Sequence, residues 1–361
     1  EVYGCYTREE VFMLVGRQTA AKKMQGTATG AFHLSEHNAS LLFVTLNKSD
    51  KDFSPTTQYD DYVVNENFFH WMYTDEEGCN VILAEDEHNA ICGMIGVIKY
   101  NSTKNPDIVG TMWKVLHTKN PQLGLDIGKK MYEIYNPRCD IGPGLNKRAL
   151  KINQMMGYFG AAMGHLYVLG VCMEYRIAKV IKKQERISCM SKKRLVEIHT
   201  KDKLRMIYND ALQRRRVPYK DFNYVVHRFI QHPIYSYRFF GIENEKGVIK
   251  AFFVVREVEH DGAKVCKIVD YYGPYEEIID TASEVYRFVD ENNYEYMDIY
   301  CYGVPEEYLF TAGFSWCTNE EAIIPNYFAP FEQKNTDIYF ATSLWGEFDV
   351  FRGDADQDRP S

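Results

Sequence analysis

The sequence lacks the short motifs that would place it in several common enzyme classes. None of its nine cysteines stands in a C-x-x-C pair, and no histidine cluster has zinc-ligand spacing. Neither a Walker A loop nor a Ser-His-Asp order occurs. No apolar stretch reaches the about 18 residues that a membrane-spanning helix needs. Zinc, P-loop and triad chemistry are therefore not indicated, and no metal is expected.

An excess of positive charge is also missing. The 361 residues carry a formal net charge of −8, which argues against a broad nucleic-acid-binding face. Cys92, Cys172, Cys266 and Cys301 sit inside apolar runs and are expected to be small buried hydrophobes. This use of cysteine fits a reducing compartment better than a disulfide framework, so we expect a cytoplasmic protein.

What the sequence does contain is a long internal repeat. The pair Gly157-Tyr158, which ends one predicted helix, returns 156 residues later as Gly313-Phe314. Strand-like runs precede both pairs in the same order, at 81–85, 91–98 and 108–117 in the first copy and at 237–243, 248–258 and 264–272 in the second. A period this long indicates a duplicated domain, because solenoid repeats have periods of roughly 20–50 residues.

Each copy is predicted to be a mixed twisted sheet flanked by helices, in the α/β or α+β class, since strand meanders alternate with a crossover. The first copy continues with a helix after a Gly-containing loop and a second helix at 147–156; the second copy continues with a helix at 275–292 and a strand at 294–302. We predict a distinct segment at 1–70, lobes at 71–178 and 204–345, a linker at 179–203 and a tail at 346–361. The acidic tail is expected to be a loose terminus, although it could fold back over a cleft.

The Gly-containing loop of the first copy opens the helix behind its central strand. It reads Pro121-Gln122-Leu123-Gly124-Leu125-Asp126-Ile127-Gly128-Lys129-Lys130. Unpaired amides at a helix start attract phosphate together with the helix dipole, and glycine lets the backbone approach closely. The alternative is a capped helix whose Asp126 stabilises its own N-terminus.

This order of elements resembles the GNAT acyltransferase fold, so we expect two tandem GNAT-like lobes. The family's phosphate-binding turn follows Q/R-x-x-G-x-G/A; Gly124 matches its first glycine, whereas Pro121 and Asp126 depart from it. The resemblance implies acyl-CoA or acetyl-CoA as the cofactor. Asn146 matches the family's region beside the coenzyme arm, or is only a helix cap. The donor contacts that the resemblance implies are Leu123, Gly124, Ile127, Gly128, Lys129 and Asn146.

Across residues 66–361 the closer resemblance is to tandem GNAT-like proteins of bacterial lipopolysaccharide or capsule biosynthesis. It is carried by residues 68–73, 120–124, 232–235 and 267–271 and by the terminal run 351–360. It implies acyl transfer to a small-molecule or glycan acceptor. Such a transfer needs a base and oxyanion donors. The candidate catalytic residues are Asp270, His232, Tyr235 and Asp298, with His165 a further one; each could instead be structural.

Residues 1–71 resemble something unrelated, a domain of unknown function at the C-terminus of some bacterial superfamily II helicases. The runs that carry this resemblance are 6–10, 38–49 and 51–62. This segment either substitutes for the first strand and helices of a GNAT lobe or leaves the lobe incomplete, which would favour a homodimer. Three functions stay open: an acyltransferase, a non-catalytic binding protein with a degenerate donor loop, and an accessory module of a helicase or nuclease system.

Overall fold

The computed structural model describes residues 28–32, 66–75, 78–85, 91–115, 122–188, 191–328 and 331–354. Its mixed sheets flanked by helices confirm the predicted fold class. The chain forms two compact units, and the boundary between them lies between Asp140 and Ile141 in the sequence.

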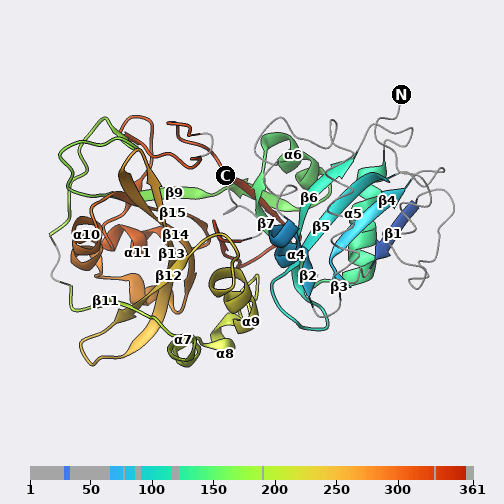
Figure 1. Ribbon diagram of the computed structural model, residues 1–361, viewed down its shortest axis with the longest axis horizontal. Coiled ribbons are helices and arrows are strands. Elements are labelled where there is room, and N and C mark those ends of the chain that lie inside the picture. The colour runs from blue at the N-terminus through green and yellow to red at the C-terminus, as the bar shows by residue number, and fades with distance from the viewer. Residues whose placement is uncertain are drawn as a thin grey trace. The chain divides into compact units, whose positions relative to one another are not determined.

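The first unit is built on an antiparallel sheet with a long helix against it (Figure 1). Its strands β1 (Ala28–Phe32), β4 (Val81–Glu85), β5 (Ile91–Lys99) and β6 (Asp107–Val115) pair in that order. Helix α5 (Leu123–Tyr135) buries Leu123, Ile127 and Met131 against Ile82, Ala84, Ile95, Val97 and Ile108 of the sheet. Burial of these apolar side chains holds the helix in place.

The segment ahead of β4 completes this sheet. β1 pairs with the whole length of β4, from Ala28↔Glu85 to Phe32↔Val81. Helix α4 (Glu66–Tyr73) buries Phe68, Phe69, Met72 and Tyr73, and two short strands, β2 (Thr74–Asp75) and β3 (Gly78–Cys79), follow it. The Tyr73 hydroxyl lies 2.8 Å from the Thr111 hydroxyl on β6. Residues that precede the predicted first lobe thus supply it with a strand and most of a helix.

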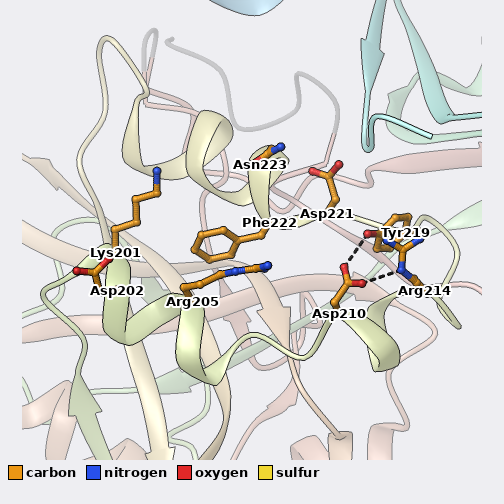
Figure 2. Close-up of a pocket in the computed structure, with 9 residues that line it drawn as sticks. All are labelled: Lys201, Asp202, Arg205, Asp210, Arg214, Tyr219, Asp221, Phe222 and Asn223. Carbon is orange, nitrogen blue, oxygen red and sulfur yellow. Dashed lines mark hydrogen bonds and ion pairs between the residues drawn. The ribbon is translucent and has the colours of Figure 1, made fainter. Parts of the chain in front are cut away.

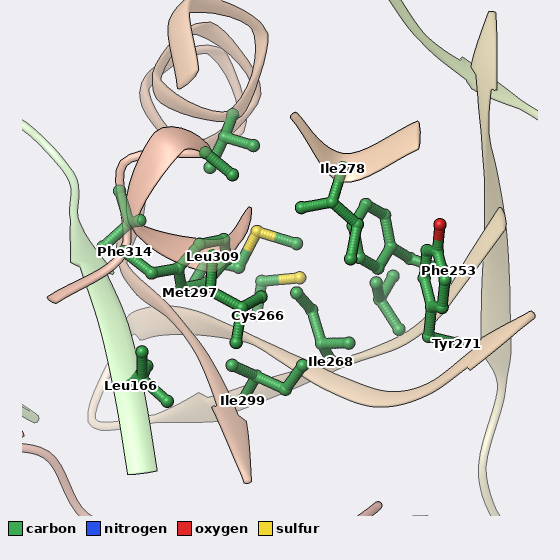
Figure 3. Close-up of a cluster of buried hydrophobic side chains, with 14 of the residues drawn as sticks. Leu166, Phe253, Cys266, Ile268, Tyr271, Ile278, Met297, Ile299, Leu309 and Phe314 are labelled. Carbon is green, nitrogen blue, oxygen red and sulfur yellow. The ribbon is translucent and has the colours of Figure 1, made fainter. Parts of the chain in front are cut away.

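The second unit contains a larger sheet. Its strands pair in the order β11 (Arg194–Glu197), β12 (Tyr237–Glu243), β13 (Ile249–His260), β14 (Ala263–Tyr272), β15 (Tyr294–Tyr302), β9 (Gly164–Leu169) and β16 (Ser315–Trp316). Strands β14 and β15 are parallel, and the other neighbours are antiparallel. Helices α10 (Ala282–Glu291) and α11 (Glu306–Thr311) cover a core that includes Cys266, Ile268, Met297, Ile299, Leu309 and Phe314 (Figure 3).

Smaller elements complete the second unit. They are α6 (Lys147–Met155), β8 (Phe159–Ala162), β10 (Lys179–Val180), α7 (Lys201–Ile207), α8 (Asp210–Gln213), α9 (Phe222–Val225), the π-helical turn η1 (Val226–Ile230), the 3₁₀ turn η2 (Tyr275–Ile278), β17 (Ala322–Ile323), β18 (Tyr339–Thr342) and β19 (Val350–Phe351). Strand β7 (Cys139–Leu145) begins parallel to β6, and its residues from Ile141 onward pair with β18.

The two repeats exchange strands. β9 precedes the second repeat in sequence, yet it lies between β15 and β16 of that repeat. Conversely, β18 belongs to the end of the second predicted lobe and lies between β7 and β8 of the first. Each of the two sheets therefore includes one strand from the part of the sequence that belongs to the other repeat.

The predicted equivalence of Gly157 and Gly313 appears in the backbone. Their φ angles are +91° and +88°, in the left-handed region that favours glycine. The next residue closes the helix in the same way in both copies: Tyr158 N donates to Asn153 O and Phe314 N to Leu309 O, each at 3.1 Å. This is the glycine-terminated helix end expected when the chain turns sharply into a strand.

Three predicted segments differ from the structure. The helix expected at 275–292 is split, because Asp280, which lies between η2 and α10, has a left-handed φ of +60°. The expected linker contains β11, which pairs with β12. The tail is not loose as far as Asp354: β19 pairs with β15, and Phe351, Arg352 and Asp354 are buried. The loose-tail prediction is wrong there, because charges far away in the sequence pair with those of the tail.

Candidate functional site

The expected donor site is the start of α5. The Asp126 amide makes the first i→i−4 bond, to the Gln122 carbonyl at 3.0 Å. The amides of Leu123, Gly124 and Leu125 precede that bond, so they have no acceptor within the helix. No side chain caps them at Gln122. Amides in this position, at the positive end of the helix dipole, suit an anionic ligand.

The side chains around this helix start serve mainly the fold. Leu123 and Ile127 are 4% and 0% exposed and belong to the core, so only their backbone could meet a ligand. Gly128 packs against Trp113 of β6, and a Cβ at Gly128 would stand 2.9 Å from the Trp113 ring. Gly124 is less confined, because its nearest contacts would lie at 3.6 and 3.8 Å.

The charges at the helix start partly cancel. Asp126 lies in the first turn, and the exposed Lys129 ammonium lies 3.9 Å from its carboxylate. Lys130 is paired with Glu133 at 2.9 Å. A carboxylate in the first turn opposes the approach of a phosphate. The exposed Lys129 is the cation best placed to offset it.

Asn146 serves as the N-cap of α6. Its side-chain oxygen accepts hydrogen bonds from Arg148 N at 3.0 Å and Ala149 N at 2.8 Å. This geometry satisfies two otherwise unpaired amides of the first turn.

The candidate Asp298 belongs to a buried charge cluster in the second unit. Its carboxylate, fully buried on β15, accepts from Arg352 at 2.8 Å and lies 3.0 Å from His165 Nε2 and 3.7 Å from Lys267 Nζ. Burial opposes ionisation, but the cations Arg352 and Lys267 hold the pKa of Asp298 well below its usual range. Burial lowers the pKa of His165 to about 4, so its imidazole is neutral near pH 7.

The candidate Asp270 belongs to a second buried cluster. Lys220 Nζ donates to both Asp270 oxygens, at 2.8 and 3.0 Å, and lies 2.6 Å from Asp354 Oδ1. The Tyr272 hydroxyl adds a hydrogen bond of 2.8 Å to Asp270. Burial raises the pKa of Asp354 to about 7, against the pull of Lys220. One ammonium between two carboxyls is balanced when they share a proton.

His232 and Tyr235 form a local turn. His232 Nδ1 accepts from the amides of Ile234 at 3.2 Å and Tyr235 at 2.9 Å. The two rings stack, with centroids 5.1 Å apart, and the Arg256 guanidinium lies 3.9 Å from the Tyr235 centroid. With Nδ1 accepting two amide hydrogens, a proton on the neutral ring belongs on Nε2.

The tail segment joins the first two of these clusters. Arg352 pairs with Asp298, and Asp354 pairs with the Lys220 that holds Asp270. Sequence reasoning noted the Asp and Arg residues of the terminal run but missed Lys220, which lies in no recognisable motif. In this conformation Asp270 and Asp298 are 0% exposed, so neither carboxylate reaches a dissolved acceptor.

An open pocket of about 470 Å³ lies elsewhere in the second unit (Figure 2). Three cations and three carboxylates line it, and Asp210 bridges the Tyr219 hydroxyl and Arg214, each at 2.7 Å. None of the residues predicted from sequence lines this pocket. The charged lining residues are Lys201, Arg205, Arg214, Asp202, Asp210 and Asp221.

Neither a membrane-spanning helix nor a metal site is found among the described residues. None of the described helices combines the length and apolar character required to traverse a membrane. Among the same residues, no group of three His, Cys, Asp or Glu side chains is arranged to hold a metal ion.

Comparison with known families gives one match. The family model described as a domain of unknown function (DUF3427) matches residues 1–85. The match covers the segment that resembles such a domain and extends through β4, but it leaves most of the chain outside. A search of curated proteins found no match.

Solved structures with a similar course of the chain include acyltransferases. A putative acetyltransferase from Pyrococcus horikoshii is 11% identical, with 89% of this chain and 91% of that chain covered and a TM-score of 0.44. A probable N-acyltransferase from Enterococcus faecalis is 6% identical, with 88% and 71% covered and a TM-score of 0.48. The N-myristoyltransferase of Saccharomyces cerevisiae with bound myristoyl-CoA is 9% identical, with 80% and 76% covered and a TM-score of 0.41. Likeness at this level concerns the fold alone.

Proposed function

We propose that the chain is an acyl-CoA-dependent acyltransferase whose donor binds at the start of α5. The observation that carries the proposal is the set of amides at Leu123, Gly124 and Leu125, which precede the first intrahelical bond and have no side-chain cap at Gln122. The coenzyme's phosphates are the chemical partner that such amides favour. We further propose that the acceptor is an amino or hydroxyl group of a sugar or glycan intermediate of surface-polysaccharide synthesis. The sequence resemblance across residues 66–361 supports this choice of acceptor.

A specific observation favours a second candidate, a non-catalytic binding protein with a degenerate donor loop. Asp126 places negative charge in the first turn of the helix. In addition, Asp270 and Asp298, the carboxylates best suited to act as a base, are consumed in buried ion pairs. A scaffold kept for binding would tolerate both features.

Calorimetry with acetyl-CoA and coenzyme A distinguishes these candidates. A matched pair of variants removes one negative charge from each end of α5: Asp126→Asn in the first turn and Glu133→Gln in the last. Under the acyltransferase proposal, the wild-type chain binds coenzyme A, and Asp126→Asn tightens binding about three- to tenfold because one close like charge is removed. Glu133→Gln leaves affinity within about twofold.

Binding by wild type together with product formation supports the enzyme. If the wild-type chain does not bind coenzyme A and the Asp126→Asn chain does, the result supports a degenerate donor loop. If neither chain binds while both melt cooperatively, the helix start is no donor site and both accounts fail.

A further inference from the structure

The parallel strands β14 and β15 separate part-way along the second unit's sheet. Their ladder runs from Lys264↔Tyr294 to Ile268↔Ile299 and stops there, although both strands continue for several residues. Two separating strands leave backbone donors and acceptors on their facing edges. Buried edges of this kind must be satisfied by another segment.

The C-terminal segment 349–354 satisfies them. On one side, Phe351 pairs with Cys301 and Val350 with Tyr302, and the Arg352 amide donates to the Tyr300 carbonyl at 3.2 Å. On the other side, the Gly353 amide donates to the Val269 carbonyl of β14 at 2.6 Å. The segment therefore bridges β14 and β15 beyond the point where their own ladder ends.

Side-chain contacts add specificity to this backbone pairing between the segment and strands β14 and β15. Phe351 is 1% exposed and joins the core of the sheet. Arg352 donates to Asp298 at 2.8 Å, and Asp354 meets Lys220 at 2.6 Å. Asp298 and Lys220 thus each pair with an oppositely charged side chain of the segment, Arg352 and Asp354 respectively.

Gly353 sets a steric limit between these two charges. A Cβ at this position would lie 2.7 Å from the Val269 carbonyl and 3.1 Å from the Phe229 ring. The Gly353 carbonyl in turn accepts from Arg228 Nε at 3.0 Å. The site between β14 and β15 therefore favours an aromatic residue, an arginine, a glycine and an aspartate in that order.

We propose that the second unit is a receptor for an extended peptide strand, and that its occupant is the chain's own segment 349–354, which the same segment supplied in trans can replace. Main-chain pairing of this kind gives affinity, and the side-chain contacts give specificity. The proposal does not depend on acyl transfer, because it rests on β14, β15, the tail and the contacts of Lys220, Arg228 and Phe229.

The test uses the full chain with a protease site inserted between Gly346 and Glu347, where Trp345, Gly346 and Glu347 are all exposed. After cleavage, the released fragment is expected to remain bound in size-exclusion chromatography. A fluorescent peptide of residues 347–361 should then exchange with it. The exchange is followed by polarisation against excess unlabelled competitor.

Three competitor peptides make the test specific. The Gly353→Ala peptide should compete at least about tenfold more weakly, because its Cβ has no room. The Arg352→Gln peptide should also compete more weakly, since it leaves the buried Asp298 without its closest cation. The Glu347→Ala peptide, altered at an exposed position, should match the wild-type sequence.

Several results would overturn the proposal. They are loss of the fragment on cleavage from a chain that still melts cooperatively, unfolding of the chain on cleavage, and equal competition by all peptides. A fragment that stays bound but never exchanges over days would also refute the claim of replacement. A chain that ends at Gly346 provides a second reading: the wild-type peptide should raise its melting temperature, and the Gly353→Ala peptide should not.

Discussion

Asp354→Asn should change how the stability of the second unit depends on pH. The Asp354 carboxyl is fully buried beside Lys220 and near Asp270, and burial raises its pKa from 3.8 to about 7. Asparagine resembles the protonated carboxyl in size and cannot ionise. Differences between the two chains therefore report the titration of the carboxyl pair that Asp354 forms with Asp270 around Lys220.

The sign follows from proton linkage. Below about pH 4 the carboxyl is protonated in both the folded and the unfolded chain, and its contribution to folding is complete. As pH rises toward 7, the unfolded chain releases the proton first, so the free energy of unfolding falls. A shift of about three pKa units corresponds to a loss of about 4 kcal/mol between pH 4 and pH 8 in wild type relative to Asp354→Asn.

Urea unfolding at a series of pH values measures this difference, with hydrogen exchange of β14 and β15 peptides assigning the transition to the second unit. Glu347→Gln is the control, because it removes an exposed carboxyl from the same stretch of chain. A wild-type minus Asp354→Asn difference that stays flat between pH 4 and pH 8 would show that this carboxyl is ionised in the folded state. The shared-proton account of the cluster would then be wrong.

Two other predictions concern packing and histidine titration. Gly128→Ala should lower the free energy of unfolding of the first unit by about 1–3 kcal/mol, because the new methyl would meet Trp113. Gly124→Ala is the control and should change that free energy by no more than about 0.5 kcal/mol. Equal losses of stability in thermal melts would contradict the close contact at Gly128. Burial lowers the pKa of His165 to about 4, so its contribution to the free energy of unfolding is complete above about pH 6.5 and falls as the pH drops toward 4. A His165→Gln chain whose stability keeps the acid dependence of the wild type would refute this.

The strands could be predicted because each shows its pattern locally. The predicted strands 237–243 and 294–302 coincide with β12 and β15, and 81–85 with β4. Runs of β-branched and aromatic residues bounded by turn residues are sufficient for such predictions. The glycine at each repeated helix end, Gly157 and Gly313, was equally visible, because a positive φ there nearly demands glycine.

Strand neighbours across the repeats could not be predicted in the same way. Nothing in the residues of β9 indicates that it pairs with β15, which lies more than a hundred residues further along the chain. The same holds for β18, which inserts between β7 and β8. Local hydrophobic pattern defines a strand but not its partners, and connections between consecutive elements are only usually short.

The tail shows a different limit of sequence reasoning. A run rich in Asp and Arg normally indicates a solvated terminus, since burying an unpaired charge is costly. That rule fails when the compensating charges lie elsewhere: Arg352 pairs with Asp298, 54 positions away, and Asp354 with the still more distant Lys220. One signal in the run itself does favour burial, because Phe351 and Gly353 alternate with the charged residues, as expected of a strand with an apolar anchor and one tight backbone contact. Phe351→Ala should therefore weaken the pairing of the segment with β14 and β15 as much as the loss of either ion pair does. In a tail held by charge alone, the same substitution would leave that pairing unchanged.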